Sequence, residues 1–176
     1  MGSINLRIMV TTLIIIAVCI YAVYNAVALA FFGVPESLSN TYYLYQDKCN
    51  KGWLFCAMMY LVVAFMMPAW ISMSEGSAFQ FLSFLAPASL MFVGTAPRFK
   101  DSDMENKVHS VAAIVAAICS LLWVGLVTPY WWTILVWLGI EAAFAVFTKT
   151  WKSGLVYWLE TIAFGATFTS TIIYSI

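Results

Sequence analysis

Apolar residues occupy this chain in long, nearly uninterrupted blocks, and short polar connections separate the blocks. The blocks cover about residues 8–32, 53–71, 78–95, 108–127, 131–147 and 155–176, of which the third and fifth are the shortest. A helix of about 20 apolar residues crosses the hydrocarbon layer of a bilayer, and its backbone groups satisfy one another there. The pattern predicts an all-α, polytopic integral membrane protein with a single domain over residues 1–176, built as a bundle of six transmembrane helices.

Composition strengthens the membrane assignment and narrows the chemistry. Hydrophobic residues make up 64% of the chain and charged residues 9%, whereas about a quarter of the residues of a soluble domain are charged. The net charge is zero, so we expect no attraction to nucleic acid. Three of the four cysteines lie inside apolar blocks and no CxxC pair occurs. We therefore expect no disulfide framework, no metal site and no cofactor.

The basic residues predict the orientation of the helices. Arg7 stands alone on one side of the membrane, whereas the other side carries Lys48, Lys51, Arg98, Lys100, Lys107, Lys149 and Lys152. Loops rich in lysine and arginine stay in the cytoplasm, so both termini are predicted on the non-cytoplasmic side. Tryptophan favours the membrane interfaces. The six-span pattern places five tryptophans there, namely Trp53, Trp70, Trp131, Trp132 and Trp151.

The connection over residues 33–52 is polar and rich in tyrosine. Pro35 and Glu36 suit the first turn of a helix, and Leu38, Tyr42 and Tyr45 follow at helical spacing. One interpretation is an amphipathic helix over residues 34–48 that lies in the inner membrane interface. The other is that the stretch dips into the bundle and lines a site with Ser37, Ser39, Asn40 and Thr41.

A second polar connection, over residues 98–107, mixes positive and negative side chains. Short runs of mixed charge are typical of solvated loops, and the full pattern of a calcium-binding loop is missing. We expect an exposed loop here.

Two carboxylates lie inside the last two apolar blocks. Glu141 lies seven residues before Thr148, and Glu160 lies six residues after Gly154, which places both about 10 Å from the cytoplasmic face. A charge at the centre of a bilayer costs about 3 kcal/mol on insertion scales. Two acids at one depth therefore predict a shared partner, a shared proton or a water-filled site.

Other polar side chains cluster near this level. Asn25 lies seven residues before the end of the first block at Phe32, and His109 begins the fourth block at the cytoplasmic edge. With the stretch at residues 37–41, they predict a polar cavity that opens to the cytoplasm. The alternative for the acids and Asn25 is a hydrogen bond that joins two helices, and for His109 a position on the surface.

Short motifs follow one another in a particular order between the first and fourth blocks. Pro35-Glu36-Ser37-Leu38-Ser39 precedes the second span, and Phe92-Val93-Gly94-Thr95-Ala96-Pro97 ends the third. A charged loop follows, and His109 comes just before Ala112 and Ala113. In these features residues 33–125 resemble the Frag/DRAM-like six-helix membrane proteins and related prokaryotic membrane families. The resemblance implies a six-helix bundle that handles lipids in a prokaryotic inner membrane, and it brings no catalytic residues.

Three functions fit these patterns. The leading hypothesis is a protein that binds or transports a small cation, a proton-linked solute or a lipid head group. Its pocket would have Glu141, Glu160 and Asn25 at the core, and at the mouth Ser37, Ser39, Asn40, Thr41 and His109. The second hypothesis is a structural protein, in which a partner or a second copy packs on small residues such as Gly139 and Ala143.

The third hypothesis, an enzyme that modifies membrane lipids, is disfavoured. The chain has one histidine, so it cannot supply a three-histidine zinc site. The GxSxG motif of serine hydrolases is also missing. Ser37, His109 and Asp101 have the residue types of a catalytic triad. A triad is defined by the geometry of its side chains, however, which the sequence does not supply. We expect no catalytic residues.

Overall fold

The computed structural model describes residues 2–176, and within this range it is all-α with seven helices. They are α1 (Gly2–Phe32), α2 (Thr41–Cys49), α3 (Trp53–Met73), α4 (Leu82–Thr95), α5 (Asp103–Val127), α6 (Trp132–Phe147) and α7 (Leu155–Ser175). Six of the helices correspond to the apolar blocks, and α2 corresponds to the second half of the tyrosine-rich connection. Helix α2 buries Thr41, Tyr42 and Tyr45 and packs on α3.

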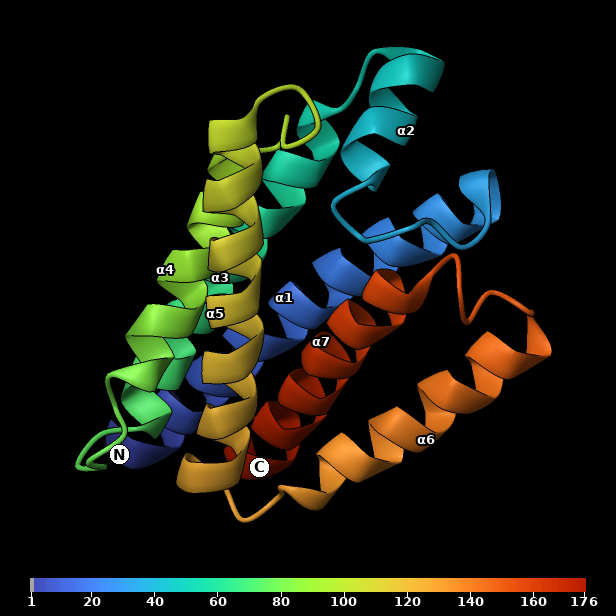
Figure 1. The fold of residues 1–176 in the computed structure, drawn as a ribbon. Helices are drawn as coiled ribbons and strands as arrows, with labels where there is room; N and C mark the ends of the chain where they lie inside the picture. Colours follow the sequence, from blue (N-terminus) through green and yellow to red (C-terminus); the bar gives the residue numbers. More distant parts are fainter. Residues whose placement is uncertain (1) are drawn as a thin grey trace.

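Five of the helices form a closed ring. Neighbouring pairs in extensive contact are α3 with α4, α4 with α5, α5 with α7, α7 with α1, and α1 with α3. Helix α6 makes its extensive contact with α7 and stands at the edge of the molecule (Figure 1). This position explains its exposure: α6 buries only Thr133, Glu141 and Ala145.

Helix α7 is in extensive contact with α1, α5 and α6. It carries small and hydroxyl side chains, which allow neighbouring helices to approach closely and to hydrogen-bond across the contact. Ser170 bonds to Thr133 of α6 at 2.6 Å, and Thr169 accepts from the Trp137 indole N–H at 2.9 Å. These bonds hold α6 against α7, which is the one helix with which α6 makes extensive contact.

The pair Trp70 and Trp123 lies in the core and corrects one expectation. Trp70 is 4% exposed and therefore does not lie at the membrane interface as its position near a helix end suggested. Its ring stacks on that of Trp123 with centroids 4.6 Å apart, and its indole N–H donates to Thr171 of α7 at 3.1 Å. The other four predicted interface tryptophans are exposed, namely Trp53, Trp131, Trp132 and Trp151.

Helix α5 begins at Asp103, five residues before the predicted start at residue 108. The reason is local: Ser102 accepts a hydrogen bond from the Glu105 backbone N–H and caps the helix, with Asp103 and Glu105 in its first turn. The second half of the predicted loop at residues 98–107 is therefore helical. Helix α4 starts later than predicted, at Leu82 instead of residue 78.

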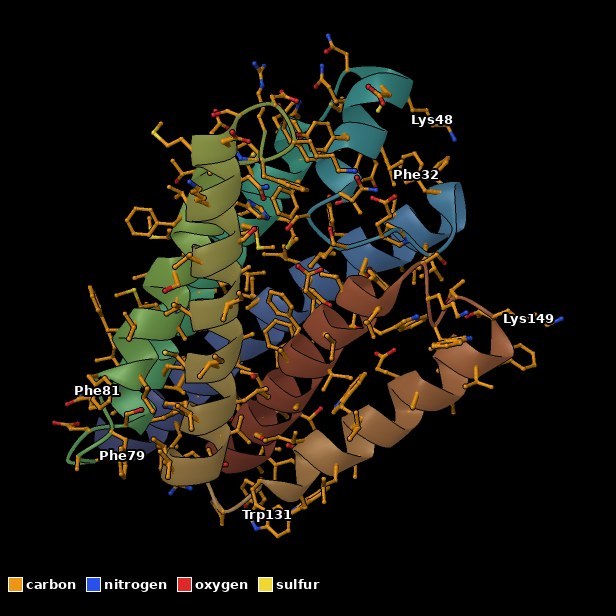
Figure 2. The ribbon with its side chains drawn as sticks, in the orientation of Figure 1. Phe32, Lys48, Phe79, Phe81, Trp131 and Lys149 are labelled. Carbon is orange, nitrogen blue, oxygen red and sulfur yellow. The ribbon has the colours of Figure 1, made fainter. Side chains whose placement is uncertain are left out.

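Three helices are long and apolar enough to cross a bilayer, and they indicate an integral membrane protein. They are Ile4–Phe32, Trp53–Met73 and Asp103–Val127, and two shorter apolar helices accompany them, Leu82–Thr95 and Trp132–Phe147. Lys48 and Lys149 lie at one end of the molecule, and Phe79, Phe81 and Trp131 lie at the opposite end (Figure 2). The N- and C-terminal ends of α1 and α7 lie near each other at the lower end of the view (Figure 1), where Arg7 donates to the Ile176 carbonyl at 3.5 Å.

Candidate functional site

Glu160 links α7 to the connection between α1 and α2. Its Oε2 atom accepts a hydrogen bond of 2.6 Å from the backbone N–H of Leu38. Leu38 opens a short helical turn that leads into α2, and Ser37 caps this turn by accepting from the Asn40 N–H at 3.0 Å. A helix N-terminus carries a partial positive charge and unpaired N–H groups, so a carboxylate is favoured there. Glu160 thus fastens the turn to α7.

Two further bonds hold the same connection inside the molecule. The Tyr157 backbone N–H donates to the Glu36 carbonyl at 3.2 Å, and the Tyr24 hydroxyl bonds to the Thr41 hydroxyl. As a result Ser39 and Thr41 are 2% and 0% exposed. The Ser39 hydroxyl has no hydrogen-bond partner within residues 2–176. The polar stretch that the sequence singled out therefore packs against α1 and α7.

Tyr157 is the polar residue of this region that the sequence analysis missed. Its side chain is 1% exposed, and its hydroxyl donates to Asn25 Oδ1 at 2.9 Å. The sequence spacing could have identified Tyr157, because it lies three residues before Glu160 and therefore on the same face of a helix.

Glu141 lies between α6 and α7 and is 7% exposed. It lines a groove of about 400 Å³ between these helices, together with Lys149, Trp151 and Trp158. Among residues 2–176 the one ion pair within 4.0 Å joins Lys100 to Glu36. Glu141 therefore has no cationic partner in the part of the chain that the structure describes, and Thr161 is the polar side chain beside it.

The two predicted core acids line different cavities. Glu160 borders a central cavity of about 60 Å³ between α3, α4, α5 and α7, whereas Glu141 borders the α6–α7 groove. They share no hydrogen bond within the described range. The structure brings Glu160, Asn25 and residues 37–41 together through Tyr157 and Leu38, and it places Glu141 at the groove between α6 and α7.

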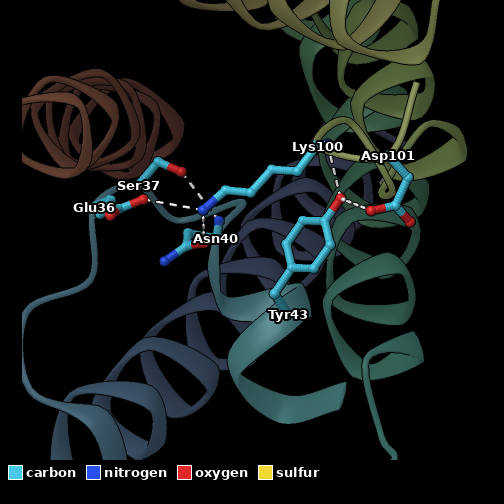
Figure 3. Close-up of polar contacts among 6 residues, drawn as sticks. All are labelled: Glu36, Ser37, Asn40, Tyr43, Lys100 and Asp101. Carbon is cyan, nitrogen blue, oxygen red and sulfur yellow. Dashed lines mark hydrogen bonds and ion pairs between the residues drawn. The ribbon is translucent and has the colours of Figure 1, made fainter. Parts of the chain in front are cut away.

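Lys100 holds the α4–α5 connection against the α1–α2 connection (Figure 3). Its Nζ atom pairs with Glu36 at 3.0 Å and donates to Asn40 Oδ1 at 2.8 Å. Its backbone N–H donates to the Tyr43 hydroxyl at 2.8 Å, and that hydroxyl donates to Asp101. Burial raises the pKa of Tyr43, so it remains a donor at neutral pH. The side-chain oxygen of Asn40 is thus already engaged by Lys100.

His109, the last predicted residue of the mouth, lies at the connection between α4 and α5. It is 5% exposed, its Nδ1 atom bonds to the Ala96 carbonyl at 2.9 Å, and its ring stacks on Phe99. These contacts fasten the end of α4 to the start of α5. Ser37 and Asp101 are bonded to Asn40 and Tyr43 respectively, so each member of the triad drawn on paper has a structural partner of its own.

Comparison of the chain with protein-family models, curated proteins and solved structures finds no match.

Proposed function

We propose that the protein is a six-span membrane protein that binds a small cation or a lipid head group beside its buried glutamates, reached from the cytoplasmic side. The spans are α1, α3, α4, α5, α6 and α7, and α2 lies at the inner interface. Both termini are non-cytoplasmic, because the lysine-rich connections stay inside. The membrane is the inner membrane of a prokaryote, and the handling of lipids follows from the resemblance at residues 33–125.

Glu141 carries the proposal. A carboxylate buried without a cation is costly in an apolar medium, and Glu141 is 7% exposed with no ion-pair partner in residues 2–176. The groove beside it measures about 400 Å³, which lies in the usual range for sites that bind small molecules. A ligand cation in this groove would give the carboxylate the partner that the described chain does not provide.

The other side chains of the groove favour a particular kind of ligand. Lys149 supplies a positive charge at the lysine-rich end, eight residues from Glu141, and Trp151 and Trp158 supply aromatic surfaces. An ammonium group near Glu141 and a phosphate near Lys149 would satisfy both charges, and aromatic faces attract ammonium groups. This is the chemistry of a zwitterionic lipid head group.

Lipid retention by the purified protein tests the proposal. Native mass spectrometry in detergent would compare phosphatidylethanolamine with phosphatidylglycerol, which lacks the ammonium group. We expect a preference for the zwitterionic lipid that Glu141→Gln removes and that Glu75→Gln, at an exposed loop position, keeps. An unchanged preference in Glu141→Gln would overturn the proposal.

A second function, contact with a partner protein through α6, is favoured by a separate observation. Helix α6 has one extensive neighbour, and a Cβ atom added at Gly139 would meet nothing within 4 Å. Small residues at such a face allow close helix association in membranes. A complex that Gly139→Leu dissociates in detergent, with Glu141→Gln still assembled, would support this function in place of ligand binding.

A further inference from the structure

A second cavity lies inside the five-helix ring, separate from the α6–α7 groove. It measures about 60 Å³, several times the space that one water molecule requires. Its walls come from α3, α4, α5 and α7 and are almost entirely apolar, with Met59, Met66, Val93 and Phe164 among them. No lysine or arginine borders it in the described chain.

Two polar groups of α7 border this cavity. Glu160 uses Oε2 to accept from Leu38, and its other oxygen has no hydrogen bond to residues 2–176. Thr167 is 4% exposed, and its hydroxyl has no partner within the same range. Seven residues separate them, which is two helical turns and about 10 Å on one face of α7. The cavity thus has a carboxylate and an unpaired hydroxyl at two levels, with apolar walls between.

The carboxylate, the unpaired hydroxyl and the apolar walls together favour some classes of ligand over others. An anion is repelled by the Glu160 carboxylate, and a pure hydrocarbon leaves the Thr167 hydroxyl unpaired. An ammonium group has three hydrogens to donate and carries the opposite charge to the carboxylate. Methylene groups attached to it would cover the apolar walls between the two polar levels.

We propose that the central cavity binds a linear alkyl amine, with its ammonium group at Glu160 and its chain directed toward Thr167. A hydroxyl at the far end of the chain pairs with Thr167, so an amino alcohol binds more tightly than the simple amine of the same length. This site differs from the α6–α7 groove in its position and in its acid.

Calorimetric titration of the protein in lipid nanodiscs, with empty nanodiscs as the blank, tests the proposal. The probes are hexylamine, 6-aminohexan-1-ol, hexan-1-ol and hexanoate. We expect the two amines to bind at least tenfold more tightly than hexan-1-ol, and hexanoate not to bind. Equal binding of all four probes, or binding of none, would overturn the proposal.

Variants separate the roles of the side chains. Glu160→Gln should remove the preference for amines, and Thr167→Val should remove the advantage of the amino alcohol over hexylamine. Ala116→Leu adds a larger side chain to the α5 wall of the cavity and should abolish binding, whereas Ala143→Leu, on the exposed face of α6, should not. Amine binding that survives in Ala116→Leu would overturn the proposal even if Glu160→Gln fails to fold.

The two ligand sites are distinguishable by their acids. Glu141→Gln should leave alkyl amine binding unchanged, because Glu141 does not border the central cavity. Loss of amine binding in Glu141→Gln would assign the amines to the groove and overturn this inference.

Discussion

The backbone N–H of Leu38 donates a hydrogen bond of 2.6 Å to the carboxylate of Glu160, across 122 residues of chain. The bond joins the start of the turn that leads into α2 to the first half of α7. Glu160 is half-buried, and one of its oxygens is already engaged as the partner of this turn. The other oxygen of Glu160, and the Glu141 carboxylate, which has no ion-pair partner in residues 2–176, are the groups available to a ligand.

We expect Glu160→Ala to loosen the connection between α1 and α2. The substitution leaves the Leu38 N–H without its partner, which costs about 1–3 kcal/mol in a buried setting. Glu160→Gln keeps an acceptor oxygen and should cost less. Hydrogen exchange of the peptide that spans residues 34–45 would measure the effect. Exchange at the wild-type rate in Glu160→Ala would show that this bond does not hold the connection.

Tyr157→Phe should destabilise the packing of α1 against α7. The change removes the hydroxyl that donates to Asn25, and a net loss of about 1 kcal/mol is typical of such a bond. Unfolding of Tyr157→Phe, Asn25→Leu and the double variant gives their interaction energy. Tyr174→Phe is the control, because Tyr174 is 40% exposed. Additive effects in the double variant would contradict the assigned bond.

Gly165→Ala should weaken the attachment of α6 to α7. A Cβ atom at residue 165 would overlap the Trp137 ring, so the ring would have to move and its bond to Thr169 would be strained. Overpacking of this kind costs about 1–3 kcal/mol. Gly125→Ala is the matched control, since its Cβ would meet nothing within 4 Å and alanine favours helix by about 1 kcal/mol. Equal stability of both variants would contradict the close approach.

Cysteine labelling should place the two ends of the bundle on opposite sides of the membrane. In a chain without its own cysteines, Lys51→Cys should react with an impermeant maleimide only in inverted vesicles. Ser77→Cys, in the α3–α4 connection, should react only in right-side-out vesicles. This outcome follows from the bias of lysine and arginine toward the cytoplasm. Labelling of both positions from one side would rule out the six-span topology.

The positions of the helices followed closely from the apolar pattern, because long apolar blocks have few other structures in lipid. Helix ends were less predictable. Asp103 became helical because Ser102 caps it, a local signal that the charged pattern concealed. Trp70 lies in the core, where it stacks on Trp123. The sequence places Trp70 near a helix end, but it does not reveal whether the side chain faces the neighbouring helices or the lipid.

The candidate site could be predicted only in part. The sequence singled out Glu141, Glu160, Asn25 and residues 37–41, since polar groups in apolar blocks are costly and therefore conspicuous. It could not say which of them meet. The depth of a residue in the membrane follows from counting residues along the helix. Which neighbouring side chains it meets depends on the positions of the other helices, which the sequence does not give.

By itself, the sequence determined that this chain is helical and belongs in a membrane, because hydrophobic length and charge bias act locally and need no partner. Only the tertiary structure decided that Glu160 bonds to Leu38 while Glu141 lines a groove between α6 and α7. The physical reason is that hydrogen bonds and cavities depend on how helices pack in three dimensions, and two acids predicted at the same depth border different cavities.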